Sequence, residues 1–292
     1  MALKAAADAA GRPIYLEMSS VNPVVVLPGA LKERGEELAG ELAGSVTMGA
    51  GQFCTKPGLV FACEPGAEQL EADLRSAFSE AVAGPLLTDD VGRTADDHVN
   101  GQVTGGANLA ATGTATEQAR ASVAPTLLAV DGATWLGDPD TFQREVFGPV
   151  TTLIRCQDRD QLMACLAHLE GNLTGTVYSA ADGTDDGDYD QVAPMLADRV
   201  GRLLNDKPPT GVAVVPAMNH GGPFPATGHP GFTAVGVPAS MQRFGQLCCF
   251  DNVRDHRLPE ELRAANPLGL QRYVDDVWTT APVRWGESGV AA

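Results

Sequence analysis

The stretch VTTLIRCQDRDQLMACLAHLEGNLTGTVYS, residues 150–179, carries the pattern that decides the fold. Its first part, Val150–Cys156, is rich in apolar and β-branched residues and predicts a strand. Asp158 is a typical helix N-cap, and leucines then recur at helical spacing until Gly171-Asn172 ends the helix. Thr174–Ser179 predicts a second strand. A strand, a helix and a strand in succession predict a unit with parallel strands.

The same alternation continues on both sides of this unit. Further strands are predicted at Val24–Leu27, Gly58–Cys63, Ala124–Val130 and Arg202–Asn205, and helices over 31–46, 70–78 and Tyr189–Val200. We also expect an Ala-rich helix over 1–10, a loop rich in Gly and Pro over 207–238, and a weakly helical tail over Leu258–Leu270 and Tyr273–Trp278. The predicted class is therefore α/β with a largely parallel sheet.

The composition excludes several classes of protein. The 292 residues are 44% apolar and carry a net charge of −17. Nucleic acid and anionic membrane surfaces repel such a chain, so neither is an expected partner. No apolar run approaches the roughly 18 residues that a membrane-spanning helix needs.

The cysteines and the first residues indicate the compartment. Six cysteines in a chain of this length are too few for a disulfide scaffold, and none forms a Cys-x-x-Cys pair. Residues 1–10 lack the apolar core of a secretory signal. We therefore expect a reducing, cytoplasmic setting, and we predict no metal site.

The segment Met48-Gly49-Ala50-Gly51-Gln52-Phe53-Cys54-Thr55-Lys56-Pro57-Gly58 is the most informative for chemistry. A nucleophile needs a sharply positioned backbone whose own N–H is free to stabilise an oxyanion, and glycines permit that conformation. Lys56 would favour the thiolate of Cys54 if its side chain turned inward. The alternative is that Cys54 is a small buried apolar residue beside a turn.

Two carboxylates are candidates for a site. Glu17 lies between Leu16 and Met18, so burial is expected to raise its pKa and suit it to general-base work. Glu145 precedes the turn Gly148-Pro149, where it can accept two ribose hydroxyls while Phe147 packs against a ring. The alternatives are that Glu17 pairs with a nearby basic group and that Arg144 and Glu145 form a plain surface pair.

Together, and in the order Glu17, Cys54, Glu145, these segments resemble the aldehyde dehydrogenase superfamily. That family carries a Glu-Leu-Gly-Gly-x-Asn-Pro, a Gly-Gln-x-Cys and a Glu-x-Phe-Gly-Pro segment in this order, and the resemblance covers nearly the whole chain. Ser19-Ser20 replaces Gly-Gly, and His220-Gly221-Gly222-Pro223-Phe224-Pro225-Ala226-Thr227 replaces a Pro-Phe-Gly-Gly stretch. These departures resemble the branch that acts on 2-oxoglutarate semialdehyde.

The resemblance implies a role for each residue. Cys54 would attack the aldehyde, Glu17 would activate the water that hydrolyses the thioester, and Glu145 and Phe147 would contact NADP or NAD. The substrate would be a small acidic aldehyde, for which Lys56 and Arg243 are the candidate cations. A homo-oligomer is expected, through a late strand near Val212–Val215 or Leu247–Phe250.

The resemblance also implies the domain organisation. Residues 1–22 would be a remnant of a Rossmann-like coenzyme domain, 23–220 the catalytic domain, and 221–292 a returning loop and tail. No glycine-rich coenzyme-binding turn precedes Gly11, so an N-terminal coenzyme-binding portion would be missing and this chain alone would have little dehydrogenase activity. The alternatives are a cofactor-independent thiol esterase and a non-catalytic assembly fragment.

Overall fold

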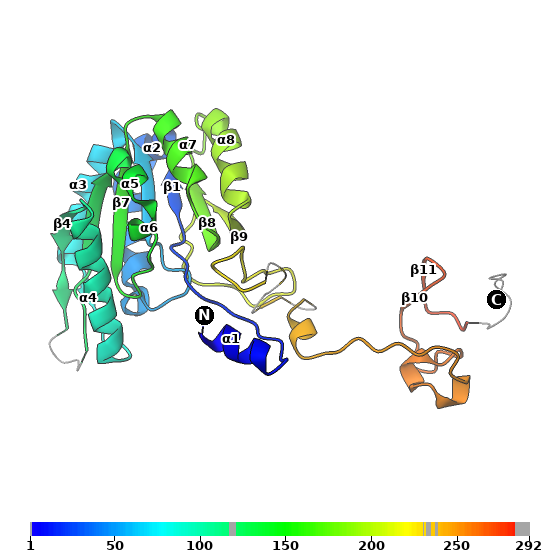
Figure 1. Ribbon diagram of the computed structural model, residues 1–292. Helices are drawn as coiled ribbons and strands as arrows, with labels where there is room; N and C mark the ends of the chain where they lie inside the picture. Colours follow the sequence, from blue (N-terminus) through cyan, green and yellow to red (C-terminus); the bar gives the residue numbers. More distant parts are fainter. Residues whose placement is uncertain (1, 117–120, 230, 232–234, 237–238, 284–292) are drawn as a thin grey trace. The chain divides into compact units, whose positions relative to one another are not determined.

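A computed structural model describes residues 2–116, 121–229, 231, 235–236 and 239–283 (Figure 1). The chain divides into two units, residues 1–243 and 244–292. In the first unit, a sheet has the strand order β4-β6-β7-β2-β1-β8-β9. Its strands are β1 (Val24–Val26), β2 (Leu59–Cys63), β4 (Asn108–Thr112), β6 (Thr126–Asp131), β7 (Val150–Cys156), β8 (Asn172–Tyr178) and β9 (Val200–Asn205). All pairings are parallel except β4 with β6, so the predicted class is confirmed.

The helices lie on both faces of this sheet (Figure 1). They are α2 (Pro28–Thr47), α3 (Gly66–Glu80), α4 (Asp89–Thr104), α5 (Gly132–Gly137), α6 (Pro139–Phe142), α7 (Arg159–Ala167) and α8 (Asp186–Ala197). A further helix, α1 (Ala2–Ala9), lies at the start of the chain and has no buried residues. The side chain of Asp158 accepts a hydrogen bond of 2.9 Å from the Gln161 N–H, which confirms the predicted cap of α7. The short strands β3 (Val82–Ala83) and β5 (Thr114–Ala115) form a separate pair.

Strand residues alternate between two cores, one on each face. Val25 and Phe61 point into the core formed with α5, α7 and α8, where Phe61 meets Trp135 edge-on at 5.7 Å between ring centroids. Val24 and Val60 point into the opposite core, formed with α2 and α3. A parallel strand covered on both faces is buried at nearly every position, so its residues are mostly apolar or β-branched, which explains the apolar runs in the sequence.

The second unit contains short elements. They are the 3₁₀ turns η3 (Asp255–Arg257) and η4 (Glu260–Leu262) and the hairpin of β10 (Arg272–Val274) with β11 (Val277–Thr279); η2 (Ala239–Arg243) ends the first unit. The predicted helical tail is therefore wrong. Asp275 and Asp276 both have positive φ, which suits a two-residue hairpin turn, and Tyr273 faces Trp278 across the strands.

A search of the helices in the described residues finds none long and apolar enough to span a bilayer.

Candidate active site

The amino ends of four neighbouring parallel strands position the site. Glu17 precedes β1, Cys54 precedes β2 and Glu145 precedes β7, while Asn172 is the first residue of β8. Because parallel strands begin at the same edge of a sheet, the folding of this sheet brings the three predicted segments together. The Ser20 N–H, for example, donates to Glu145 Oε2 at 3.1 Å.

The glycines before Cys54 are required by close backbone contact. Gly51 has a φ of +71°, and a Cβ placed on it would lie 2.0 Å from the carbonyl oxygen of Gly148. Only glycine satisfies both conditions without strain. The loop that carries Cys54 therefore packs directly on the loop that follows Glu145.

Asn22 joins the Glu17 segment to the Cys54 segment. Its side chain is fully buried, and Nδ2 donates to the carbonyl oxygens of Cys54 at 2.9 Å and Lys56 at 3.0 Å. Its Oδ1 accepts from the hydroxyls of Ser20 at 2.9 Å and Thr174 at 2.8 Å. The sequence indicates only a turn at Asn22-Pro23, so this positioning role is a finding of the structure.

Asn172 fastens the same segment to the sheet. Its Oδ1 accepts from the backbone N–H groups of Val21 at 2.8 Å and Asn22 at 3.1 Å. Both asparagine side chains are buried and have hydrogen-bond partners, so they fix the backbone around the site with little freedom.

His220 lies between the two predicted catalytic residues. Its Nε2 is 3.2 Å from Cys54 Sγ and 3.3 Å from Glu17 Oε1. Close backbone packing sets its position, because a Cβ on Gly201 would lie 1.7 Å from the Gly221 carbonyl oxygen. The motif that contains His220 distinguishes a branch in the sequence, but only the structure shows that its imidazole joins Cys54 and Glu17.

Hydrogen bonds within this cluster shift the pKa values of His220 and Glu17. The hydrogen bonds with Cys54 and Glu17 raise the pKa of His220 to about 9 despite its burial. The hydrogen bond from His220 lowers the pKa of Glu17 below its usual 4.5, outweighing the effect of burial. The expectation of a raised pKa for Glu17 is therefore wrong, because its side chain is 29% exposed and has a cationic neighbour.

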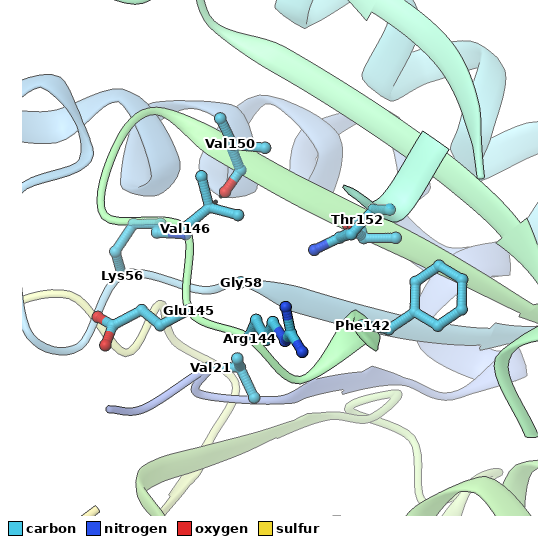
Figure 2. A pocket seen from close by; sticks show the side chains of 10 residues that line it. Val21, Lys56, Gly58, Phe142, Arg144, Glu145, Val146, Val150 and Thr152 are labelled. Carbon is cyan, nitrogen blue, oxygen red and sulfur yellow. Dashed lines mark hydrogen bonds between the residues drawn. The ribbon is translucent and has the colours of Figure 1, made fainter. Parts of the chain in front are cut away.

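Lys56, which is buried, and Glu145, which is half-buried, interact electrostatically. Lys56 is 2% exposed, and its Nζ donates to the Val150 carbonyl oxygen at 2.7 Å. Burial lowers the pKa of Lys56 to about 8 and raises that of Glu145, while each charge favours the ionised form of the other. Figure 2 shows both on the same side of a cavity of about 10 Å³, enough for about one water. Lys56 is thus sealed from a substrate carboxylate.

Some of the expected cofactor contacts fit the geometry. The carboxylate of Glu145 lies at the same edge of the sheet as that of Glu17. The negative charge of Glu17 contributes to the raised pKa of Glu145. The Phe147 side chain is 39% exposed, which leaves an aromatic surface beside Glu145. A carboxylate for ribose hydroxyls and an apolar ring fit part of a dinucleotide, so these residues are compatible with NAD(P).

The cluster also has the donor atoms of a metal site. Glu17, Cys54 and His220 each offer one ligand atom, and these atoms all lie within 4.8 Å of one another. A thiolate, an imidazole and a carboxylate are the ligands that zinc prefers. The sequence predicts no metal site, because the three residues are far apart along the chain.

Comparison with known proteins places the chain in a family. The aldehyde dehydrogenase family matches residues 1–214. The chain therefore belongs to the aldehyde dehydrogenase family, as the three sequence segments predict.

Two curated relatives are similar over most of the chain. Over 269 residues it is 40% identical to "Alpha-ketoglutaric semialdehyde dehydrogenase 2" of Azospirillum brasilense, an alignment that covers 90% of this chain and 50% of the relative. It is 37% identical over 269 residues to "Alpha-ketoglutaric semialdehyde dehydrogenase" of Acinetobacter baylyi strain ADP1, covering 91% and 50%. The chain thus spans about half the length of the curated relatives it matches.

Solved structures agree with the fold. The NAD⁺ complex of an aldehyde dehydrogenase from Bacillus cereus superposes with a TM-score of 0.63 at 18% identity, covering 77% of this chain and 45% of that one. A betaine aldehyde dehydrogenase variant from Staphylococcus aureus, also with NAD⁺, gives 0.62 at 19% identity, covering 77% and 45%. At these identities the likeness supports the fold alone.

Proposed function

We propose that this chain carries the catalytic centre of an NAD(P)-dependent dehydrogenase that oxidises 2-oxoglutaric (alpha-ketoglutaric) semialdehyde to the carboxylate. The observation that carries the proposal is the Cys54–His220–Glu17 cluster, with Nε2 of His220 within 3.3 Å of both partners. The names of the two relatives, at 40% and 37% identity, support the substrate.

Cys54 is the proposed nucleophile. The His220 imidazolium lies 3.2 Å from Sγ and attracts the thiolate form. The thiolate sulfur bonds to the aldehyde carbon, and the carbonyl π electrons move to oxygen. The Cys54 backbone N–H is the proposed donor to this oxyanion, and His220 supplies a proton to give a thiohemiacetal.

When bound, NAD(P) would supply the hydride acceptor for oxidation of the thiohemiacetal, and the hydroxyl proton would return to His220 as the thioester forms. Glu145 is the proposed acceptor for ribose hydroxyls, with its backbone held by the hydrogen bond of 2.8 Å between its carbonyl oxygen and His98 Nδ1. Phe147 provides an apolar surface beside it. The proposal leaves NAD or NADP as the coenzyme.

Glu17 is the proposed base for hydrolysis of the thioester. Once the sulfur is acylated it has no negative charge, so the largest cause of the raised pKa of His220 disappears. Glu17 then receives a proton from water, and the hydroxide oxygen bonds to the thioester carbon as the thiolate leaves. His220, still hydrogen-bonded to Glu17, attracts the returning thiolate.

A thiol esterase is the second candidate. The cluster of Cys54, His220 and Glu17 is formed without Glu145 or Phe147, so acylation by an activated ester needs no coenzyme. A non-catalytic assembly fragment is the third possibility.

We also propose a cytoplasmic setting, because all six cysteines are free thiols. Self-association is proposed as well, because Val214 and Leu247 have exposed apolar side chains.

The test compares the purified 292-residue chain with Cys54→Ser, His220→Gln and the matched control Cys248→Ser, whose thiol is exposed. We expect iodoacetamide to modify Cys54 before the other cysteines, and His220→Gln to slow this step at least about tenfold at pH 7. Equal reactivity of all six cysteines would overturn the proposed nucleophile.

Two assays of turnover follow. Hydrolysis of p-nitrophenyl acetate that is lost in Cys54→Ser and retained in Cys248→Ser supports the acyl-enzyme chemistry. Oxidation of 2-oxoglutaric semialdehyde with NAD⁺ and with NADP⁺ tests the coenzyme, and robust oxidation by this chain contradicts the expectation of impaired activity. Esterase activity without any oxidation favours the second candidate.

A further inference from the structure

Arg202 is a cationic side chain at the same edge of the sheet as Cys54. It lies near the amino end of β9, next to Gly201, which packs against the backbone of Gly221. Because β9 is parallel to β8, its first residues share an edge with the start of β8 and with the catalytic cluster. The sequence contains no signal that separates Arg202 from the other arginines.

The contacts of Arg202 place its guanidinium between two loops that reach Cys54. Nη2 donates to the carbonyl oxygens of Pro209 and Gly211, both at 3.3 Å. Thr210, between them, donates to the Thr55 carbonyl oxygen at 3.5 Å, which ties that loop to the nucleophile's neighbour. Nη1 lies 3.5 Å from Met218 Sδ, two residues before His220.

Within the part of the chain that the structure describes, no carboxylate forms an ion pair with Arg202. Its buried Nε has no hydrogen-bond partner among the described residues either. Burial lowers the pKa of Arg202, while an electrostatic interaction with Cys54 raises it. The Met218 sulfur is a weak acceptor, which leaves donors on Nη1 for a ligand.

The other two cations expected to bind an acidic substrate are less suitable. Lys56 is buried beside Glu145 and is sealed from solvent. Arg243 stacks over the Tyr15 ring, with 5.7 Å from its central carbon to the ring centroid, and its charge already acts on Glu17, where it helps to lower the pKa of that carboxyl. A chain with a net charge of −17 repels an anion, so a substrate carboxylate needs a cation within reach of the nucleophile.

We propose that Arg202 binds the carboxylate of the substrate and so selects 2-oxo acid aldehydes over neutral aldehydes at Cys54. The guanidinium binds a carboxylate through charge-assisted hydrogen bonds, which holds the far end of the molecule while the aldehyde carbon faces Sγ. The identity of the substrate in this inference rests on the proposed function. The inference itself concerns recognition of the substrate carboxylate and not the oxidation step.

The experiment compares alkylation of Cys54 by iodoacetate, an anion, and by iodoacetamide, its neutral analogue. In both reactions the sulfur displaces iodide, so neither requires a coenzyme. The variants are Arg202→Gln, Arg202→Lys and the matched control Arg199→Gln. Arg199 also donates to backbone carbonyl oxygens, those of Ala167 and Leu169 among them, but it has no described contact with the Cys54 loops.

We expect Arg202→Gln to lower the ratio of the iodoacetate rate to the iodoacetamide rate about tenfold, which corresponds to ~1.4 kcal/mol. The iodoacetamide rate should stay within about twofold, Arg202→Lys should retain much of the ratio, and Arg199→Gln should leave it unchanged. A ratio unchanged in Arg202→Gln, or an equal loss of both rates, overturns the proposal, because a merely structural role affects both reagents alike.

A second measurement separates this inference from the proposed function. Calorimetry measures binding of 2-oxoglutarate, the product of the proposed oxidation, to the unmodified chain and to Arg202→Gln. Weaker binding in the variant supports the anion site even if Cys54 proves unreactive, and equal binding overturns it. Circular dichroism checks the fold of each variant, and Arg202→Met, which also removes the charge, serves if Arg202→Gln does not fold.

Discussion

Substitution of Asn22 tests whether one buried amide holds the site together. Asn22 is fully buried, has a φ of +45°, and makes four side-chain hydrogen bonds of 3.0 Å or less. At about 1 kcal/mol each, Asn22→Ala loses about 4 kcal/mol from these bonds. An alanine at positive φ adds about 1 kcal/mol. We therefore expect the free energy of unfolding to fall by about 5 kcal/mol.

Asn22→Gly separates the two contributions. Glycine tolerates the positive φ, so this variant should lose the hydrogen bonds but be about 1 kcal/mol more stable than Asn22→Ala. The control is Asn100→Ala, on the exposed face of α4, where the change should stay within about 0.5 kcal/mol.

The assay is urea unfolding followed by the fluorescence of Trp135, which is fully buried. Alkylation of Cys54 by iodoacetamide is measured in parallel, because Asn22 holds the carbonyl oxygen of Cys54. Both variants should slow it relative to Asn100→Ala. A loss below about 1 kcal/mol in Asn22→Ala, or a glycine variant less stable than the alanine variant, would refute the reasoning.

Three further predictions concern the same edge of the sheet. The pKa of His220 is raised to about 9, so its stabilising contribution is complete below its unfolded pKa of about 6.5 and is lost as the pH rises through 9. The stability difference between the native chain and His220→Gln should therefore shrink by about 3 kcal/mol over this range in urea titrations, and a constant difference would contradict it. Gly51→Ala places a methyl 2.0 Å from a carbonyl oxygen at a φ of +71° and should lower the free energy of unfolding by about 3 kcal/mol. The control Gly44→Ala, in open space on a helix, should not lower it. Equal melting temperatures of the two variants would contradict the close packing at Gly51. Zn²⁺ should bind Glu17, Cys54 and His220 and protect Cys54 from alkylation until a chelator is added. Mg²⁺ should give no protection. Alkylation at the same rate with and without Zn²⁺ would exclude the proposed zinc site.

Much of the sheet is predictable because its strands are covered on both faces. Runs such as Val150–Cys156 are rich in apolar and β-branched residues and almost wholly buried, and the leucine spacing of α7 and α3 matches their buried faces. The helix α4 is not predicted, because its sequence has few buried apolar positions and contains Gly92 and Gly101. The edge strand β4 is also missed, since its residues are partly or fully exposed.

The candidate site is predictable only in part. Cys54, Glu17 and Glu145 lie in segments whose order along the chain is recognisable. The direction of the pKa shift of Glu17 is not predictable, because it depends on His220, 203 residues away. The burial of Lys56 beside Glu145 is a tertiary contact of the same kind.

By itself the sequence determines the class of fold, the family, and the loops that carry the nucleophile and the carboxylates, because these depend on local patterns of apolar, glycine and polar residues. The tertiary structure decides which side chains meet. The parallel sheet brings the starts of β1, β2 and β9 to one edge, where His220 joins Cys54 to Glu17 and Arg202 holds the loop of Pro209 and Gly211. Electrostatic interactions act over a few ångströms in space and are independent of separation along the chain, which is why the charges of this site follow from the fold.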